Sequence, residues 1–347
     1  MSRQRPLTTP GDFAAAGLMT GAEAEALAPV AERYAIAVTP FLAARIDRDD
    51  PADPIARMFV PSPEELVRTP EELVDPIGDE PHSPVPGIVH RYPDRVLLKP
   101  VAVCPVYCRF CFRREMVGPD LGETLTPAAL EGALDYIRTQ PGVREVILTG
   151  GDPFMLSAAR AKALTDAIAA IPHVSVIRWH TRMPVADPTR VTPAFVEALK
   201  APGKAVYVSI HINHIRELSP ETLETAARLA DAGIPLLAQT VLLRGVNDSA
   251  DALADLMQAL VAARIRPYYL HHPDLAPGTG HFRLTVEEGQ AIYSALRDRV
   301  SGLALPHYVI DIPGGVSKAN AAPSDVIDTP EGRALRGRDG QLHPYKG

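Results

Sequence analysis

Residues 95–111 read Arg-Val-Leu-Leu-Lys-Pro-Val-Ala-Val-Cys-Pro-Val-Tyr-Cys-Arg-Phe-Cys. The first part is an apolar run typical of a strand that is buried on both faces of a parallel sheet. The second part holds all three cysteines of the 347-residue chain, Cys104, Cys108 and Cys111. An iron–sulfur cube is normally bound by four cysteine thiolates, so three ligands leave one iron with an open coordination position. The segment therefore predicts a strand followed by a [4Fe-4S] site to which a small molecule can bind.

Further apolar runs follow along the chain and alternate with helical stretches. The predicted strands are residues 96–103, 145–149, 174–180, 205–212, 235–243, 267–271 and 308–312. A hydroxyl residue precedes a proline at Thr126, Thr192 and Ser219, which marks helix starts because the hydroxyl caps the first turn and proline suits its first position. Six or seven such units predict an α/β fold, a partial or full parallel (β/α) barrel, with its chemistry at the carboxyl ends of the strands.

The segments on either side of this region have a different character. Residues 1–90 predict an N-terminal helical extension, residues 91–318 the barrel core and residues 319–347 a polar C-terminal tail. The net charge of −7 argues against a nucleic-acid or anionic-membrane footprint. No apolar run reaches the roughly 18 residues that span a bilayer, and the first residues lack the apolar core of a signal peptide. We therefore expect a cytoplasmic protein, in which cysteines stay reduced.

Structural zinc is the main alternative for three close cysteines, usually with Cys or His as the fourth ligand. The chain has no further cysteine, and the nearest histidine, His90, lies well upstream of the loop. The C-x₃-C-x₂-C spacing, with the aromatic Phe110 before the last cysteine, resembles the radical S-adenosylmethionine (SAM) superfamily. The resemblance implies that SAM binds the open iron through its amino and carboxylate groups. It also implies that the reduced cluster cleaves SAM to a 5′-deoxyadenosyl radical.

A second motif, Leu148-Thr-Gly-Gly-Asp-Pro153, follows the next predicted strand. Taken alone, it is equally well explained as a tight turn between a strand and a helix. After a cluster loop, it resembles the Gly-Gly-Glu/Asp motif of the radical SAM superfamily. This resemblance implies that Gly150, Gly151 and Asp152 contact the amino group of SAM.

The segment Asp311-Ile-Pro-Gly-Gly-Val-Ser-Lys318 follows the last predicted strand. A lysine in such a loop is most often a solvated surface residue. Here the segment resembles the one with which lysine 2,3-aminomutases bind pyridoxal phosphate (PLP), which implies that Lys318 is the catalytic lysine that holds PLP. The same resemblance implies that Arg91, Tyr92 and Arg95 help to hold the PLP phosphate, for which guanidinium groups are well suited. The alternative for the two arginines is a surface ion pair.

Other polar residues at strand ends also match this family. The resemblance implies that Arg113 binds the substrate carboxylate, and that Asp274 and Asp311 bind the ε-ammonium of lysine. Two carboxylates around one ammonium compensate its loss of water and repel an acidic side chain. His211 and Gln239 are implied contacts to SAM or PLP, with a satisfied polar group in the barrel rim as the alternative for each.

The resemblance as a whole implies a radical SAM, PLP-dependent 2,3-aminomutase, an isomerase that moves the α-amino group of L-lysine to the β-carbon. It also implies an external electron donor for the cluster. The chain has no further cysteines to serve as the structural zinc ligands of longer family members. In its length and its number of cysteines, it resembles a compact branch of the family whose β-lysine modifies translation elongation factor P. Several alternatives stay open at this point. The substrate could be arginine, ornithine or glutamate, and the protein could be a radical SAM maturase without PLP or a non-catalytic metal or electron-transfer module. The chain could also form a homo-oligomer.

Overall fold

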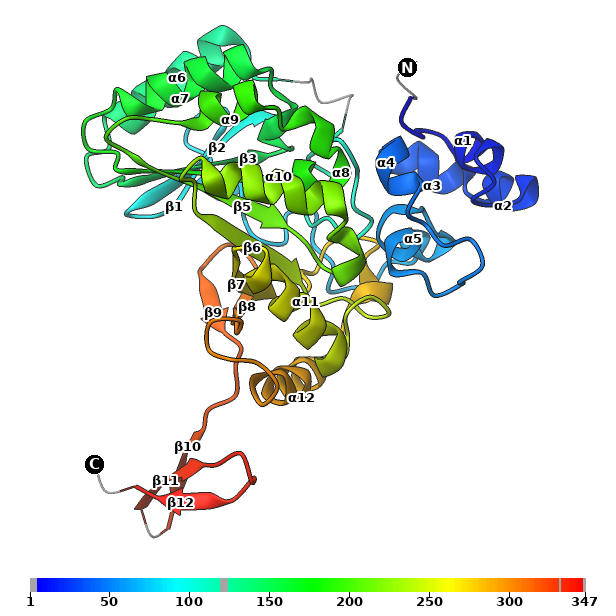
Figure 1. The fold of residues 1–347 in the computed structure, drawn as a ribbon, viewed down its shortest axis with the longest axis vertical. Coiled ribbons are helices and arrows are strands. Elements are labelled where there is room, and N and C mark those ends of the chain that lie inside the picture. Colours follow the sequence, from blue (N-terminus) through cyan, green and yellow to red (C-terminus); the bar gives the residue numbers. More distant parts are fainter. Residues whose placement is uncertain (1–4, 119–123, 331, 346–347) are drawn as a thin grey trace.

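A largely parallel sheet forms the body of the protein (Figure 1). The computed structural model describes residues 5–118, 124–330 and 332–345. In these residues the sheet runs in the spatial order β1 to β9, with β2 to β8 parallel and with β1 and β9 antiparallel at its edges. Its strands are β1 (Ile88–Tyr92), β2 (Arg95–Val101), β3 (Glu145–Gly150), β4 (Val176–Thr181), β5 (Ala205–His211), β6 (Leu236–Val241), β7 (Ile265–His271), β8 (His307–Asp311) and β9 (Lys318–Asn320).

All seven predicted strands are present, and they form β2 to β8. The barrel is partial, because β1 and β9 end the strand order without pairing to each other among the described residues. The two edge strands were not predicted. Both are short and antiparallel, and β1 carries His90 and Arg91 among its five residues. Neither strand shows the continuous apolar run that marks a strand with both faces buried.

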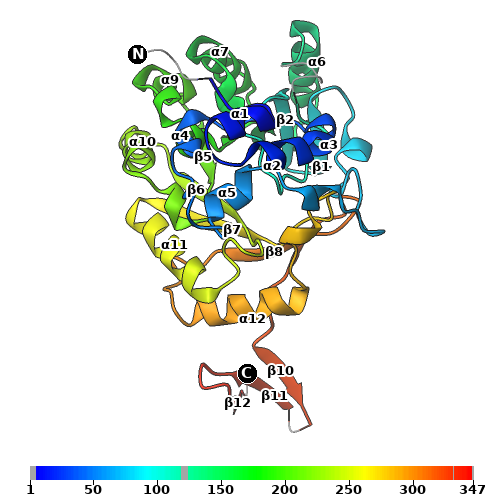
Figure 2. The same ribbon diagram turned by 90° about the vertical axis from the view of Figure 1, so that its right-hand side faces the viewer.

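Six helices connect consecutive parallel strands and lie in an arc around the outside of the sheet (Figure 2). They are α6 (Pro127–Arg138), α7 (Ala158–Ala169), α9 (Pro193–Leu199), α10 (Pro220–Asp231), α11 (Ala250–Ala262) and α12 (Val286–Arg297). The predicted caps are confirmed. Thr126, Thr192 and Ser219 each accept the backbone N–H three residues ahead, at 3.2 Å. Their hydroxyls satisfy donors that a first helical turn leaves unpaired.

Shorter helices complete the loops at the carboxyl ends of the strands. They are α8 (Met183–Ala186), η4 (Pro153–Met155), η5 (Pro188–Arg190), η6 (Ile215–Glu217) and η7 (Gly280–Phe282). Among the described residues, no helix is long and apolar enough to cross a membrane.

The N-terminal helical segment, residues 10–82, packs on the barrel. It contains α1 (Pro10–Ala15), α2 (Gly21–Ala26), α3 (Ala28–Arg33), α4 (Pro40–Ala43), α5 (Pro54–Phe59), η1 (Pro63–Leu66) and η2 (Glu80–His82). Phe13, Leu42 and Phe59 are fully buried in the same hydrophobic core as the strands. Burial of each such side chain contributes about 1.5–3 kcal/mol, so the segment is held against the barrel by shared apolar packing.

The C-terminal tail forms a small antiparallel sheet that projects from the barrel (Figure 1). Its strands are β10 (Val326–Thr329), β11 (Gly332–Arg336) and β12 (Leu342–Pro344). Most side chains of these three strands are exposed, and Ala334 is the one buried residue among those described in β10 to β12. We had expected a polar tail with little core, and these strands were not predicted.

Gly289 in α12 is a test of how closely the helices pack on the sheet. A Cβ atom there would lie 1.9 Å from Oη of Tyr308 in β8. We expect Gly289→Ala to lower the free energy of unfolding by about 1–3 kcal/mol in urea titrations, because the helix must move outward. Gly132→Ala in α6 is the matched control, since nothing lies within 4 Å of its Cβ position. That change is expected to stabilise by about 0.5–1 kcal/mol. An unchanged free energy of unfolding for Gly289→Ala would contradict this close packing of the helix on the sheet.

Candidate active site

A cavity of about 300 Å³ lies on the inner face of the partial barrel. It brings together nine predicted site residues from separate parts of the chain: Arg91, Tyr92, Arg95, Arg113, His211, Gln239, Asp274, Asp311 and Lys318. Several buried atoms of cavity residues, among them Nε of Arg91, Nε2 of His271 and Oδ1 of Asp311, have no hydrogen-bond partner in the described part of the chain. Buried polar atoms normally find a partner. This central cavity is therefore suited to a polar ligand.

Lys318 reaches the cavity through a tight hairpin between β8 and β9. Gly314 and Gly315 both have φ of 79°, a left-handed conformation that favours glycine. The hairpin register places Lys318 opposite Asp311, and Nζ of Lys318 forms an ion pair with Oδ2 of that carboxylate. The backbone N–H of Lys318 donates to Oη of Tyr92 at 3.1 Å. The Pro-Gly-Gly turn thus fixes where the lysine amine enters the cavity.

The two predicted substrate carboxylates have opposite protonation preferences. Burial raises the pKa of Asp274 to about 7, and the nearby charge of Asp311 adds to the rise. Burial also acts to raise the pKa of Asp311, but a hydrogen bond from His271 and the ammonium of Lys318 outweigh it and hold that pKa below its usual range. Asp311 is therefore ionised, while Asp274 is poised to gain or lose a proton near neutral pH.

Arg113 is oriented by Asp79, which the sequence did not single out. Nε of Arg113 donates to Oδ2 of Asp79 at 2.8 Å, and Arg91 contacts the other oxygen at 3.2 Å. Nζ of Lys99 lies 4.0 Å from the same carboxylate. Asp79 is 1% exposed. The Asp/Pro/Glu-rich segment around it resembles an ordinary loop, so only the fold reveals that it binds these cations.

Two histidines, His180 and His211, and the glutamine Gln239 also line the central cavity. Burial lowers the pKa of His211 to about 3, with the charge of Arg182 as a further cause. Burial also holds the pKa of His180 well below its ordinary value. Nε2 of Gln239 lies 3.3 Å from Nε2 of His180. Both imidazoles are therefore neutral and can donate or accept hydrogen bonds without adding charge. His180 was not predicted, since a lone histidine in an apolar strand carries no distinguishing signal.

The three cysteines lie in the loop after β2 and are free. Burial raises the pKa of each thiol, that of Cys108 to about 12, and iron binding would displace these protons. Arg182 lies near Cys108 and Cys111. No group of three His, Cys, Asp or Glu residues in the described chain is arranged to hold one metal ion. A cluster needs no such convergence, because each thiolate binds a different iron. The loop thus fits a cluster.

The Gly-Gly-Asp motif lies at the end of β3, next to the start of the cluster loop. A Cβ atom on Gly151 would lie 2.4 Å from the carbonyl oxygen of Val103, so this glycine permits close backbone packing. Gly150 and Gly151 also line a neighbouring cavity of about 180 Å³, together with Arg113. The carboxylate of Asp152 accepts from Thr181 Oγ1 at 2.8 Å and from the N–H of Arg182 at 2.7 Å. Contact of these three residues with SAM stays a prediction.

Asp79→Asn tests the anchoring of the cavity arginines. The change leaves Arg113 without its buried ion-pair partner and leaves Arg91 with only the more distant Asp311, at 3.8 Å, so we expect the free energy of unfolding to fall by about 3 kcal/mol or more, measured in urea. Asp94→Asn is the control, because Asp94 pairs with Arg95 at the surface, where an ion pair contributes about 1 kcal/mol at most. Equal stability of the Asp79 variant and the parent would show that the ion pairs do not hold the site.

Comparison with known proteins identifies the family. Residues 98–257 match the model of the radical SAM superfamily. The L-lysine 2,3-aminomutase of Clostridium subterminale is 39% identical over 328 residues, which cover 94% of this chain and 78% of that protein. The L-lysine 2,3-aminomutase of Escherichia coli (strain K12) is 37% identical over 274 residues, 79% of each chain.

A glutamate 2,3-aminomutase of Clostridioides difficile (strain 630) is also similar, with 35% identity over 309 residues, 89% of this chain and 72% of that protein. Aminomutases of both names therefore match most of this chain. The chain is an enzyme of the radical SAM superfamily and belongs to the lysine 2,3-aminomutase family, isomerases that use a [4Fe-4S] cluster, SAM and PLP.

Proposed function

We propose that this enzyme converts L-lysine to β-lysine, with PLP bound through Lys318. The observation that carries the proposal is the ion pair between Nζ of Lys318 and Asp311, which shows that the cavity contains a buried carboxylate that binds a primary ammonium. Covalent attachment of Lys318 to PLP removes its ammonium charge. Asp311 then keeps the guanidinium of Arg91 at 3.8 Å but loses its ammonium partner, and the ε-ammonium of lysine has the same chemistry as the group it would replace.

The charges of the cavity favour a basic amino acid over glutamate. Asp274 interacts with Asp311, Lys318 and Arg113, so both carboxylates share one region of the cavity. A glutamate side chain there would meet like charges in a buried environment, at a cost of several kcal/mol. Arg113, held by Asp79, supplies the cation for the substrate carboxylate. Arginine and ornithine satisfy the same charges and are the closest alternatives.

The residues of the cavity also fit PLP. Arg91, Tyr92 and Arg95 lie on the β1–β2 side of the cavity that contains Lys318. The guanidinium of Arg95 stacks 3.7 Å from the ring of Tyr92, which orders both side chains. PLP supplies the aldehyde that holds the substrate amine and a conjugated system that stabilises a neighbouring radical.

A cluster held by Cys104, Cys108 and Cys111, with SAM bound to it, would supply a radical able to remove hydrogen from the β-carbon. The chain's own residues then have three tasks: Lys318 exchanges with the substrate amine, Arg113 and the two aspartates align the substrate, and the buried walls exclude water. We place the reaction in the cytosol, with an external electron donor for the cluster.

A role in translation is consistent with the cysteine count of the chain, which leaves no cysteines for the structural zinc of longer aminomutases. We propose that the β-lysine formed here serves to modify a lysine of elongation factor P. Mass spectrometry of elongation factor P from cells with and without this enzyme tests the proposal. An unchanged mass would contradict it.

Turnover of lysine tests the main proposal. Protein with a reconstituted cluster is incubated anaerobically with lysine, SAM, PLP and a reductant, and β-lysine is measured by mass spectrometry. We expect β-lysine from the parent and none from Lys318→Ala, while Lys200→Ala, which changes a half-buried lysine outside the cavity, keeps full activity. Borohydride treatment should leave a pyridoxyl group on Lys318. No adduct would favour a radical SAM maturase without PLP, and turnover of arginine, ornithine or glutamate in place of lysine would overturn the substrate.

The raised pKa of Asp274, about 7, predicts a pH dependence of lysine binding. Asp274 must be ionised to bind an ammonium, so KM for lysine should fall as pH rises toward 7, by up to about tenfold per pH unit below the pKa. The folded protein binds an extra proton on this group between its ordinary pKa and 7, so this group's stabilising effect falls as pH rises through that window. Asp274→Asn should raise KM and remove this dependence, while Asp94→Asn should keep it. A pH-independent KM in the parent would contradict the role of Asp274.

A further inference from the structure

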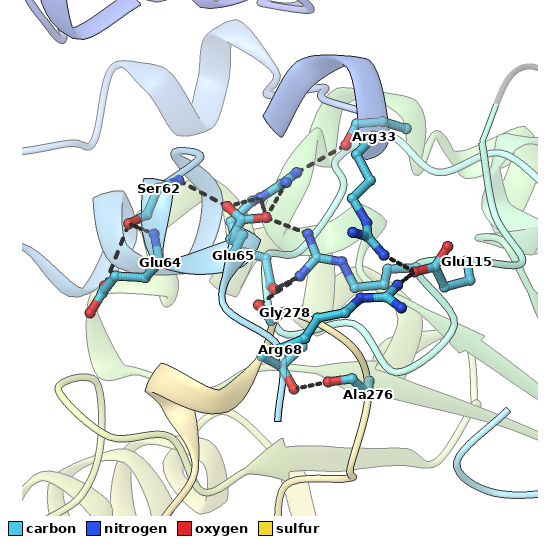
Figure 3. Close-up of polar contacts among 12 residues, drawn as sticks. Arg33, Ser62, Glu64, Glu65, Arg68, Glu115, Ala276 and Gly278 are labelled. Carbon is cyan, nitrogen blue, oxygen red and sulfur yellow. Dashed lines mark hydrogen bonds and ion pairs between the residues drawn. The ribbon is translucent and has the colours of Figure 1, made fainter. Parts of the chain in front are cut away.

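Glu65 of the N-terminal helical segment is a buried carboxylate that contacts the cluster loop (Figure 3). It lies in η1 and has no exposed surface. Its two oxygens accept from Nε of Arg109 at 2.9 and 3.1 Å, and from a terminal nitrogen of Arg114. Oε1 also accepts the backbone N–H of Ser62 at 2.9 Å, which closes a capping box on η1. Glu65 is thus fixed at both its backbone and its side chain.

Both arginine partners belong to the cluster loop itself. Arg109 lies between Cys108 and Cys111, and Arg114 follows shortly after Cys111. Nη1 of Arg114 donates to the carbonyl oxygen of Arg109 at 3.0 Å, which ties the two ends of this stretch together. Any displacement of the Glu65 carboxylate would therefore be transmitted to the backbone on both sides of Cys111.

The N-terminal segment also binds the backbone of the loop. The N–H of Tyr107 donates to the carbonyl oxygen of Ala37 at 3.1 Å, and the N–H of Arg109 donates to that of Met58 at 2.9 Å. Nη1 of Arg109 adds a bond of 2.9 Å to the carbonyl oxygen of Ala35. The cysteine loop is therefore held from outside the barrel, and Glu65 adds a buried charged contact to it.

The charges at this position do not cancel. One carboxylate faces two guanidinium groups, so the three side chains of Glu65, Arg109 and Arg114 together carry a net charge of +1. The surface pairs of Glu115 with Arg33 and Arg68, at 3.7 and 3.3 Å, are by contrast partly exposed (Figure 3). Solvent screens surface charges strongly and buried charges little. Because Glu65 has no exposed surface, its charge is screened less by solvent than that of Glu115 and acts on the loop that it contacts.

We propose that Glu65 is a positioning residue for the cluster, which fixes the cysteine loop through Arg109 and Arg114 and lowers the cluster's reduction potential. Net charge and hydrogen bonding near an iron–sulfur cluster set its potential. A negative charge disfavours addition of an electron, so its removal raises the potential. The inference applies to any radical SAM substrate and does not depend on lysine turnover.

The test compares full-length variants whose clusters are reconstituted anaerobically. Glu65→Gln keeps the shape of the side chain and brings the local charge to +2. Arg114→Gln brings it to 0, and the double variant restores +1. Glu64→Gln is the control, since Glu64 is the exposed neighbour on η1. For each protein we would measure bound iron, the electron paramagnetic resonance spectrum of the reduced cluster and its midpoint potential without SAM.

We expect Glu65→Gln to bind less iron and to shift the midpoint potential to more positive values. Arg114→Gln should shift it to more negative values, and the double variant should return toward the parent potential. Glu64→Gln should match the parent in all three measurements. Circular dichroism of the apoproteins reports whether each variant folds.

Single variants that shift in the same direction, or a folded Glu65→Gln protein with the iron content, spectrum and potential of the parent, would overturn the proposal. If Glu65→Gln does not fold, Arg114→Gln decides: a negative shift supports the proposal and an unchanged potential refutes it. These readouts precede any reaction with an amino acid. Failure here is therefore distinguishable from failure of the proposed aminomutase activity.

Discussion

The common direction of seven strands is the constraint on which the active site depends. Strands β2 to β8 pair in parallel, for example Arg95 with Glu145 and Tyr269 with His307. Their carboxyl ends therefore meet at one edge, where His211, Gln239 and Asp311 contribute to the cavity on the inner face of the sheet. The cluster loop follows β2, the Gly-Gly-Asp motif ends β3, and Asp311 closes β8. Each helix between them serves mainly to return the chain to the other edge.

The inner face of an open barrel must also accommodate buried cations, and the N-terminal helical segment supplies carboxylates for them. Asp79 binds Arg91 and Arg113 in the central cavity, and Glu65 binds the two arginines of the cluster loop. A buried charge without a partner is strongly destabilising. The segment is therefore tied to the site, because its carboxylates balance the charges of arginines in the central cavity and in the cluster loop.

Prediction from the sequence was most successful where a local residue pattern is compatible with few structures. The parallel strands were recognisable because both of their faces are buried, which removes polar residues from the run. Lys318 and Asp311 were recognisable from the Pro-Gly-Gly turn between them, and nine predicted residues do line one cavity. The edge strands β1 and β9 and the sheet of the tail were missed, because short strands with exposed or polar side chains carry little periodic signal.

Asp79, Glu65 and His180 were missed for a different reason, since each owes its role to partners that are distant in the sequence. Glu65 and its neighbour Glu64 are the same residue type in the same short helix, yet one is buried against two arginines and the other faces solvent. The sequence by itself determined the cluster loop, the parallel strands and the lysine-bearing turn, because spacing, apolar runs and glycine conformations are local properties. Only the tertiary structure decided which carboxylate meets which cation, because burial and ion pairing depend on contacts between segments that lie far apart along the chain.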